Sequence, residues 1–112
     1  MTGWRAGEPP AAFYVLASGP ALRRLAVAGE IDILTATNFG RFLRNQLDDA
    51  AAGTTVVVDL SGVRLLSAVG IGVLVQVAQE AHRKGVRLVA DPVSFQVWKM
   101  LELSHVHLAP PR

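Results

Sequence analysis

The sequence predicts an α/β fold, a single domain in which helices flank a mixed sheet of four or five strands. Strand-like and helix-like segments follow one another in the order β-β-α-β-α-β-α-β, as expected for a hairpin followed by βαβ units. The segment Thr54–Leu60 is a run rich in β-branched residues without alternation, which is typical of a strand buried on both faces. With 112 residues, of which 51% are hydrophobic, the chain suits one domain with its own core.

The first two strands are expected to form a hairpin. Ala12–Ser18 and Leu22–Ile31 are both rich in residues that favour strands. Gly19 and Pro20 lie between them and are a turn signal, so the second strand returns beside the first.

The first helix is expected over Asp32–Ala52. Asp32 or Thr35 is suited to cap its start, and Gly53 is suited to end it. Its core-facing positions recur at helical spacing: Phe39, Phe42, Leu43, Gln46 and Leu47.

The second half of the chain continues the alternation of strand and helix. After the central strand we expect a helix at Ser67–Arg83, a strand at Val86–Ala90, a helix at Pro92–Leu103 and a last strand at His105–Ala109. Lys84 and Gly85 close the first of these helices, and Asp91-Pro92 suits the start of the next. Right-handed crossovers make the later strands parallel neighbours.

Composition excludes several classes of protein. The absence of cysteine excludes disulfides, thiolate metal sites and thiol nucleophiles. The net charge is only +2 and the basic residues are spread along the chain, so we expect no nucleic-acid partner. No apolar run is long enough to insert into a membrane, and residues 1–24 do not resemble a signal peptide. We expect a cytoplasmic protein, with residues 1–11 as an arm, 12–109 as the domain and 110–112 as a tail.

The stretch from Asp59 to Leu74 has the outline of an anion site, because a loop after a strand leads into the start of a helix. It does not fit a nucleotide-binding loop. No lysine follows Gly70 or Gly72, and Val75 stands where a third glycine of a dinucleotide motif belongs. We therefore favour close packing of helix on sheet as the reason for the two glycines.

Catalytic and metal sites are not indicated either. Ser61 and Ser67 lack the G-x-S-x-G frame of a hydrolase nucleophile. His105 and His107 are spaced to share one face of a strand, but no third metal ligand is evident, so we favour surface histidines. We expect no enzyme, no metal and no cofactor.

Three ordered motifs resemble the STAS domains of bacterial anti-sigma factor antagonists. "VVVDLSGVRLLSAVGIGVLV" is similar to their central strand, D-L-S turn and D-S-[ST]-G-[LI]-G helix start. "GEIDILTA", from Gly29, is similar to the segment before their first helix. "ADPVSFQVWKMLELSHV", from Ala90, is similar to their last helix, so the resemblance covers about residues 12 to 109.

The resemblance implies a regulatory binding protein. Such an antagonist binds an anti-sigma factor, in many members a serine kinase, and thereby frees a sigma factor. The kinase phosphorylates a serine or threonine at the start of the second helix, and the added charge disrupts binding.

This sequence departs from the family at the phosphorylated position. Alignment on the Gly70-Ile71-Gly72 motif places Ser67 at the family's aspartate, Ala68 at the acceptor and Val69 at the following serine or threonine. Ala68 cannot accept phosphate. Ser67 is either a displaced acceptor or, as we favour, a helix N-cap.

The expected partner-binding surface surrounds this helix start. It comprises Asp32, Leu66, Ser67, Ala68, Val69, Gly70 and Val73, with the exposed face of the helix as far as His82. The resemblance places Asp32 beside the phosphorylation site, and helix capping explains that residue equally well. Two alternatives remain: an adaptor subunit of a larger assembly, such as a stressosome or a lipid-transport ATPase, and a module that binds a nucleotide or another small molecule. The oligomeric state is left open.

Overall fold

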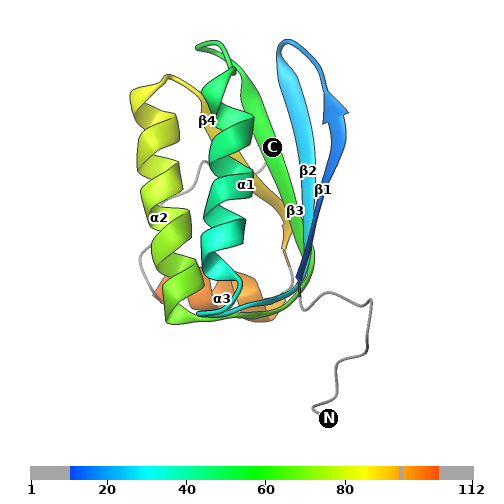
Figure 1. Cartoon of the computed structure of the whole chain (residues 1–112), viewed down its shortest axis with the longest axis vertical. Coiled ribbons are helices and arrows are strands. Elements are labelled where there is room, and N and C mark those ends of the chain that lie inside the picture. The colour runs from blue at the N-terminus through cyan, green and yellow to red at the C-terminus, as the bar shows by residue number, and fades with distance from the viewer. Residues whose placement is uncertain (1–10, 94, 104–112) are drawn as a thin grey trace.

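The computed structural model describes residues 11–93 and 95–103, which form a four-stranded sheet and three helices (Figure 1). The elements are β1 (Ala11–Ser18), β2 (Leu22–Ile31), α1 (Ala36–Asp48), β3 (Thr55–Leu66), α2 (Ala68–Arg83), β4 (Arg87–Val93) and α3 (Phe95–Leu103). The predicted α/β class and the predicted order of elements are confirmed for this part of the chain. The predicted strand at 105–109, with both of its histidines, lies outside the described residues.

The sheet is mixed, with the strand order β1-β2-β3-β4. β1 pairs antiparallel with β2 as the expected hairpin, whereas β2, β3 and β4 are parallel. Parallel pairing brings the carboxyl ends of β2 and β3 together, with Ile31 opposite Leu66. The chain then leaves both strands at one end of the sheet, and this is where α1 and α2 begin.

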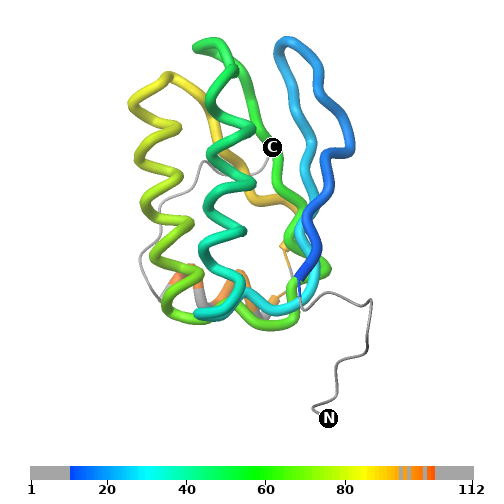
Figure 2. Tube along the Cα trace, viewed as in Figure 1, coloured from blue at the N-terminus to red at the C-terminus, as the bar shows by residue number. Residues whose placement is uncertain are grey.

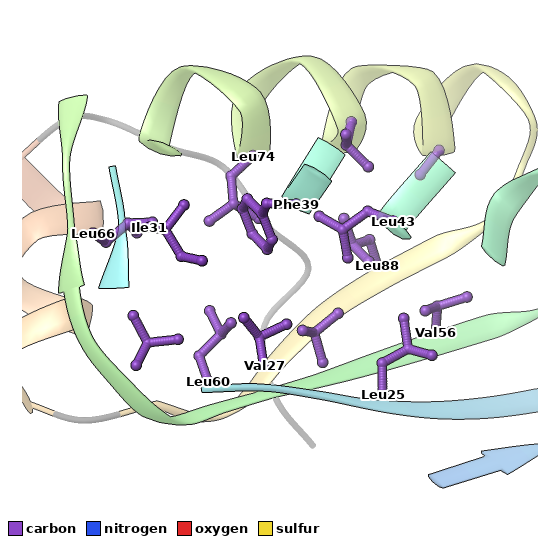
Figure 3. Close-up of a cluster of buried hydrophobic side chains, with 14 of the residues drawn as sticks. Leu25, Val27, Ile31, Phe39, Leu43, Val56, Leu60, Leu66, Leu74 and Leu88 are labelled. Atoms are coloured by element: carbon purple, nitrogen blue, oxygen red, sulfur yellow. The ribbon is translucent and has the colours of Figure 1, made fainter. Parts of the chain in front are cut away.

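The core lies between the sheet and the pair α1 and α2, which lie side by side on one face of it (Figure 1). Phe39 and Leu43 of α1 and Leu74 of α2 meet Leu25 and Leu60 of the sheet, all nearly fully buried (Figure 3). Phe13 of β1 stacks on Phe42 of α1 with ring centroids 5.3 Å apart. Such burial stabilises the fold by about 1.5–3 kcal/mol for each large apolar side chain.

The central strand is buried on both faces, as its composition predicts. Val56 and Val58 point into the core cluster, and Val57 points the other way, yet the exposed fractions of all three are between 1% and 5%. Val57 pairs with Val89 of β4, which is also buried.

Three predicted boundaries are wrong. α1 begins at Ala36 instead of Asp32, because residues 32–35 form a hydrogen-bonded turn. β3 continues to Leu66, through the segment predicted as a loop, because Gly62–Leu66 stays paired with β2. α3 begins at Phe95 instead of Pro92, because β4 extends to Val93, which pairs with Leu60.

Two smaller expectations differ in detail. The predicted arm ended at residue 11, but Ala11 is the first residue of β1. Gly53 has the expected left-handed φ of +92°, but it lies in the turn before β3, because α1 has already ended at Asp48.

Candidate functional site

The candidate site is the end of the sheet at which α2 begins. The backbone N–H of Ser67 donates a hydrogen bond of 2.9 Å to the carbonyl of Ile31, which ties the start of α2 to the end of β2. The trace in Figure 2 shows the turn before α1 and the turn before α2 at this same end. The site is therefore built from two consecutive crossovers of the parallel sheet.

Ser67 is the N-cap of α2, as the sequence analysis favoured. Its backbone is extended, with φ −74° and ψ 171°, and its side-chain oxygen accepts a hydrogen bond of 3.3 Å from the N–H of Gly70. An N-cap of this kind satisfies one of the donors that the first turn of a helix leaves unpaired. Ser67 is partly buried, whereas Ala68, the next residue, is exposed.

Gly70 explains the closeness of α2 to the sheet. A Cβ atom at this position would lie 2.7 Å from the Ile31 side chain and 2.8 Å from the Leu66 side chain. The packing interpretation is therefore correct for Gly70. It is wrong for Gly72, where a Cβ would meet nothing within 4 Å.

The expected apolar contacts with a partner need one correction. Leu66 was expected to be available to a partner, but its side chain is only 1% exposed, because it packs in the core beneath the first turn of α2 (Figure 3). Val73 is partly buried against the core, on the side of α2 that faces Gly40 of α1. Val69 is 46% exposed and remains accessible.

Asp32 organises the turn ahead of α1. Its Oδ1 accepts a hydrogen bond of 2.9 Å from the N–H of Leu34 and a longer one of 3.3 Å from the N–H of Thr35. Thr35 is the N-cap residue of α1, one of the two predicted, but its side chain makes no capping hydrogen bond to the helix. Its hydroxyl instead donates to the carbonyl of Glu30 at 2.8 Å and accepts from the N–H of Asp32 at 3.0 Å. Asp32 instead holds residues 33 and 34 outward, next to the start of α2.

Five exposed apolar side chains were not among the predicted contact residues. They lie on the turn before α1, at the end of β3 and on α3: Ile33, Leu34, Leu65, Phe95 and Trp98. All five belong to elements that meet at the end of the molecule where α2 begins (Figure 1). Together with Val69 we call them the apolar end. Their exposed fractions run from 43% for Leu65 to 83% for Leu34.

Two sequence signals point to these residues. Ile33 and Leu34 are adjacent large apolar residues in a turn, where a core-facing role is unusual. Phe95 and Trp98 fall off the stripe formed by Val97 and Leu101, both of which are buried. The two aromatic rings lie with centroids 6.2 Å apart, and the Lys99 ammonium lies 5.9 Å from the Phe95 centroid.

Other kinds of site are not evident in the described residues. Residues 11–93 and 95–103 contain no cluster of three or more His, Cys, Asp or Glu side chains that could hold a metal. Within the same part of the chain, none of the helices combines the length and apolar character that crossing a bilayer requires. A shallow depression lined by Thr37, Arg41, Arg44 and Asn45 lies on α1. Arg44 is committed there to Glu80 and Gln76 of α2.

A hairpin followed by parallel β-α-β units, with a capped, glycine-containing start of α2, agrees with the fold of a STAS domain. The chain belongs to this family: residues 16–107 match the family model described as Mlab, STAS domain. No curated protein matches the chain in sequence.

Solved structures share the fold at low sequence identity. An anti-sigma factor antagonist from Mycobacterium paratuberculosis is 22% identical, with a TM-score of 0.65; the match covers 89% of this chain and 84% of that one. The unphosphorylated form of the antagonist SpoIIAA is 12% identical, with a TM-score of 0.66 and coverage of 90% and 88%. The murine anion transporter Solute Carrier 26 family member A9 is 14% identical, with a TM-score of 0.68; the match covers 84% of this chain and 17% of the transporter.

Proposed function

We propose that this protein is a non-enzymatic, cytoplasmic anti-sigma factor antagonist, which binds an anti-sigma factor through the apolar end. Family membership supports a regulatory domain. The fold shared with two antagonists supports the choice of partner.

The observation that carries this proposal is the apolar end itself, whose side chains are exposed on several elements that meet where α2 begins (Figure 1). Ile33 and Leu34 lie on the turn before α1, Val69 lies in the first turn of α2, and Phe95 and Trp98 lie on α3. Scattered apolar residues are normal on a protein surface, but a group gathered at one end marks a contact site. Aromatic residues such as Trp98 often supply most of the binding free energy in protein interfaces.

The proposed mode of binding does not use the phosphorylation switch that the family resemblance implies. Ala68 is exposed at the family's acceptor position and has no hydroxyl group. The hydroxyl oxygen of Ser67 already accepts the N–H of Gly70. We infer that binding is constitutive and is controlled by the amount of protein or by competition, even where the partner is a serine kinase.

The experiment that tests this function is affinity capture from a lysate of the source organism, followed by identification of the retained proteins. Capture on the wild-type protein is compared with capture on Trp98→Ala, and Tyr14→Ala is the control. Tyr14 is an exposed aromatic residue of β1 and does not belong to the apolar end. An anti-sigma factor should be retained by the wild type and by Tyr14→Ala and be depleted on Trp98→Ala. Retention of no anti-sigma factor would contradict the proposal.

One alternative has an observation of its own in its favour. The matching family model is described by the name Mlab, and a domain of the same fold makes up part of a long anion transporter. An adaptor subunit of a larger assembly, such as a lipid-transport ATPase or a stressosome, would use the same apolar end. Capture of a membrane ATPase in place of an anti-sigma factor would favour this alternative.

A further inference from the structure

β1 is an edge strand with an unusual surface. Among the described residues it is hydrogen-bonded to β2 alone, and no helix lies beyond it in Figures 1 and 2. Five successive residues, Tyr14 to Ser18, are exposed, and the exposed fractions of Tyr14, Val15 and Leu16 are 51%, 49% and 60%. The strand AAFYVLAS contains no charged residue and no proline.

Proteins normally protect such an edge. Free strand edges carry charged side chains, prolines, bulges or short strands, because unpaired backbone N–H and C=O groups otherwise recruit another strand. β1 has one of these features, a bulge between Val15 and Ala17. The regular part, Ala11–Val15, is left without protection.

We propose that Ala11–Val15 pairs antiparallel with the same segment of a second copy, so that two four-stranded sheets join into one of eight strands. An antiparallel strand edge is complementary to itself across a twofold axis. Each pair of facing residues then occurs twice, once on either side of the axis. The bulge at Leu16 ends the regular ladder and so limits the register to pairing centred on Phe13. In that register Tyr14 lies across from Ala12, and Val15 lies across from Ala11.

Charge does not oppose this pairing. Within the described part of the chain, the arginines paired with β1 are Arg23 and Arg24 of β2, which lie opposite Ser18 and Ala17. Ala17 is four residues from Phe13, so the Ala17 positions of the two copies are separated by eight residues along the strands, or about 27 Å at about 3.4 Å per residue. This exceeds the screening length of about 8 Å at physiological ionic strength. The small residues Ala11 and Ala12 leave room for the exposed Tyr14 and Val15 side chains.

The pairing accounts for the exposed side chains of Tyr14 and Val15 independently of the apolar end. Cross-strand contacts of aromatic and β-branched side chains stabilise paired strands by about 0.2–1 kcal/mol each. Because only five residues pair in each copy, we expect a reversible dimer that forms as the protein concentration rises.

The test is sedimentation velocity of the full chain, from about 1 µM to about 1 mM, a range that spans weak to moderate dissociation constants. The mass should rise from 12.0 kDa towards twice that value. Val15→Lys and, separately, Tyr14→Lys should each stay monomeric at the highest concentration. Leu34→Lys, which places the same charge on the exposed apolar end, should still dimerise. Hydrogen exchange of the wild type should slow with concentration in β1 and stay unchanged in β4, at the other end of the described sheet.

Three outcomes would overturn the proposal. The wild type could remain at 12.0 kDa throughout. Leu34→Lys could abolish the dimer while both β1 variants keep it, which would place the contact at the apolar end. The β1 amides could exchange at the same rate at every concentration, a result that requires no variant to fold.

Discussion

The side-chain oxygen of Ser67 accepts a hydrogen bond from the backbone N–H of Gly70, 3.3 Å away. This contact spans Ala68, the residue that the motif resemblance aligns with the family's phosphorylated position. Ser67 itself serves to begin α2. The exposed Ala68 between the two leaves an apolar surface without a hydroxyl group.

The first prediction concerns the cap. Ser67→Ala removes the only side-chain acceptor that the structure shows for the first turn of α2, and should lower the free energy of unfolding by about 1 kcal/mol. Ser67→Asp keeps a capping oxygen and should restore most of that loss. Urea unfolding of the three proteins measures both effects. Equal stability of Ser67→Ala and wild type would show that this hydrogen bond does not contribute to stability.

The second prediction compares two glycines of α2. In Gly70→Ala the new Cβ would lie 2.7 Å from Ile31, 2.8 Å from Leu66 and 3.2 Å from the Ile31 carbonyl oxygen. Overpacking of this kind costs about 1–3 kcal/mol. In Gly72→Ala the new Cβ meets nothing within 4 Å, so the helix should gain up to about 1 kcal/mol. Thermal unfolding should shift in opposite directions, and a shift of the same sign in both variants would contradict the packing argument.

The third prediction concerns acid stability. Arg23 donates a hydrogen bond of 2.6 Å to Asp49 and adds its positive charge, and together these lower the pKa of Asp49 below its ordinary value of 3.8. A carboxyl whose pKa is lower in the folded state contributes stability above the unfolded pKa, and this contribution is lost as the pH falls through the folded value. Asp49→Asn should therefore be less stable than wild type at neutral pH, with the difference shrinking below pH 3.8. Urea unfolding at a series of pH values measures the difference, and a constant difference across that range would refute the assignment.

The fourth prediction concerns phosphorylation. Incubation of the wild type with ATP and a serine kinase that acts on a related antagonist should leave its intact mass unchanged, because Ala68 has no hydroxyl. Ala68→Ser restores the family's acceptor at an exposed position and should gain one phosphate. Phosphate localised to Ser67 of the wild type would instead make that residue a displaced acceptor.

Much of the fold follows from the sequence because local and long-range signals agree. The strand Leu22–Ile31 has the predicted bounds, and the helix after Ser67 ends at the predicted Arg83. In α2 the N-cap serine and the closing Lys84-Gly85 pair mark the same limits as the apolar spacing. The buried Val56–Val58 run was recognisable because a strand covered on both faces does not alternate.

The boundaries that were missed depend on pairing with distant residues. Ser61 and Gly62 read locally as a turn, yet β3 continues through them, because Gly62 and Val63 pair with Ala28 and Gly29 of β2. Asp91 and Pro92 suit a helix start, but Val93 finds a partner in Leu60. Tertiary pairing overrides local preference at both places.

Leu66 was predicted to contact a partner, but in the structure Leu66 is buried and its neighbour Leu65 is exposed. This difference has a similar cause. The pairing of β2 with β3 shifts between Gly29 and Glu30, so Val63 and Leu66 are both buried while Leu65 is exposed. A one-residue bulge reverses which face the later side chains occupy. Nothing in the local sequence marks that shift, so the contact residues of the strand end could not be separated from its core residues.

The most direct measurement is the affinity of Ala68→Asp for an anti-sigma factor captured by the wild-type protein. The new carboxylate would lie at the start of α2, where negative charge is favourable by about 0.3–1 kcal/mol, so the melting temperature should be kept. Unpaired in an interface, the same charge costs several kcal/mol. Ala51→Asp is the matched control, because Ala51 is exposed in the turn between α1 and β3, at the far end of α1 from the site.

Titration calorimetry measures the affinity and thermal unfolding measures the melting temperature. Both are applied to the same preparations of the wild type, Ala68→Asp and Ala51→Asp. We predict that Ala68→Asp loses at least about tenfold in affinity, which is about 1.4 kcal/mol, and that Ala51→Asp binds as the wild type does. Equal affinity of Ala68→Asp and wild type would contradict the assignment of the partner surface to the start of α2.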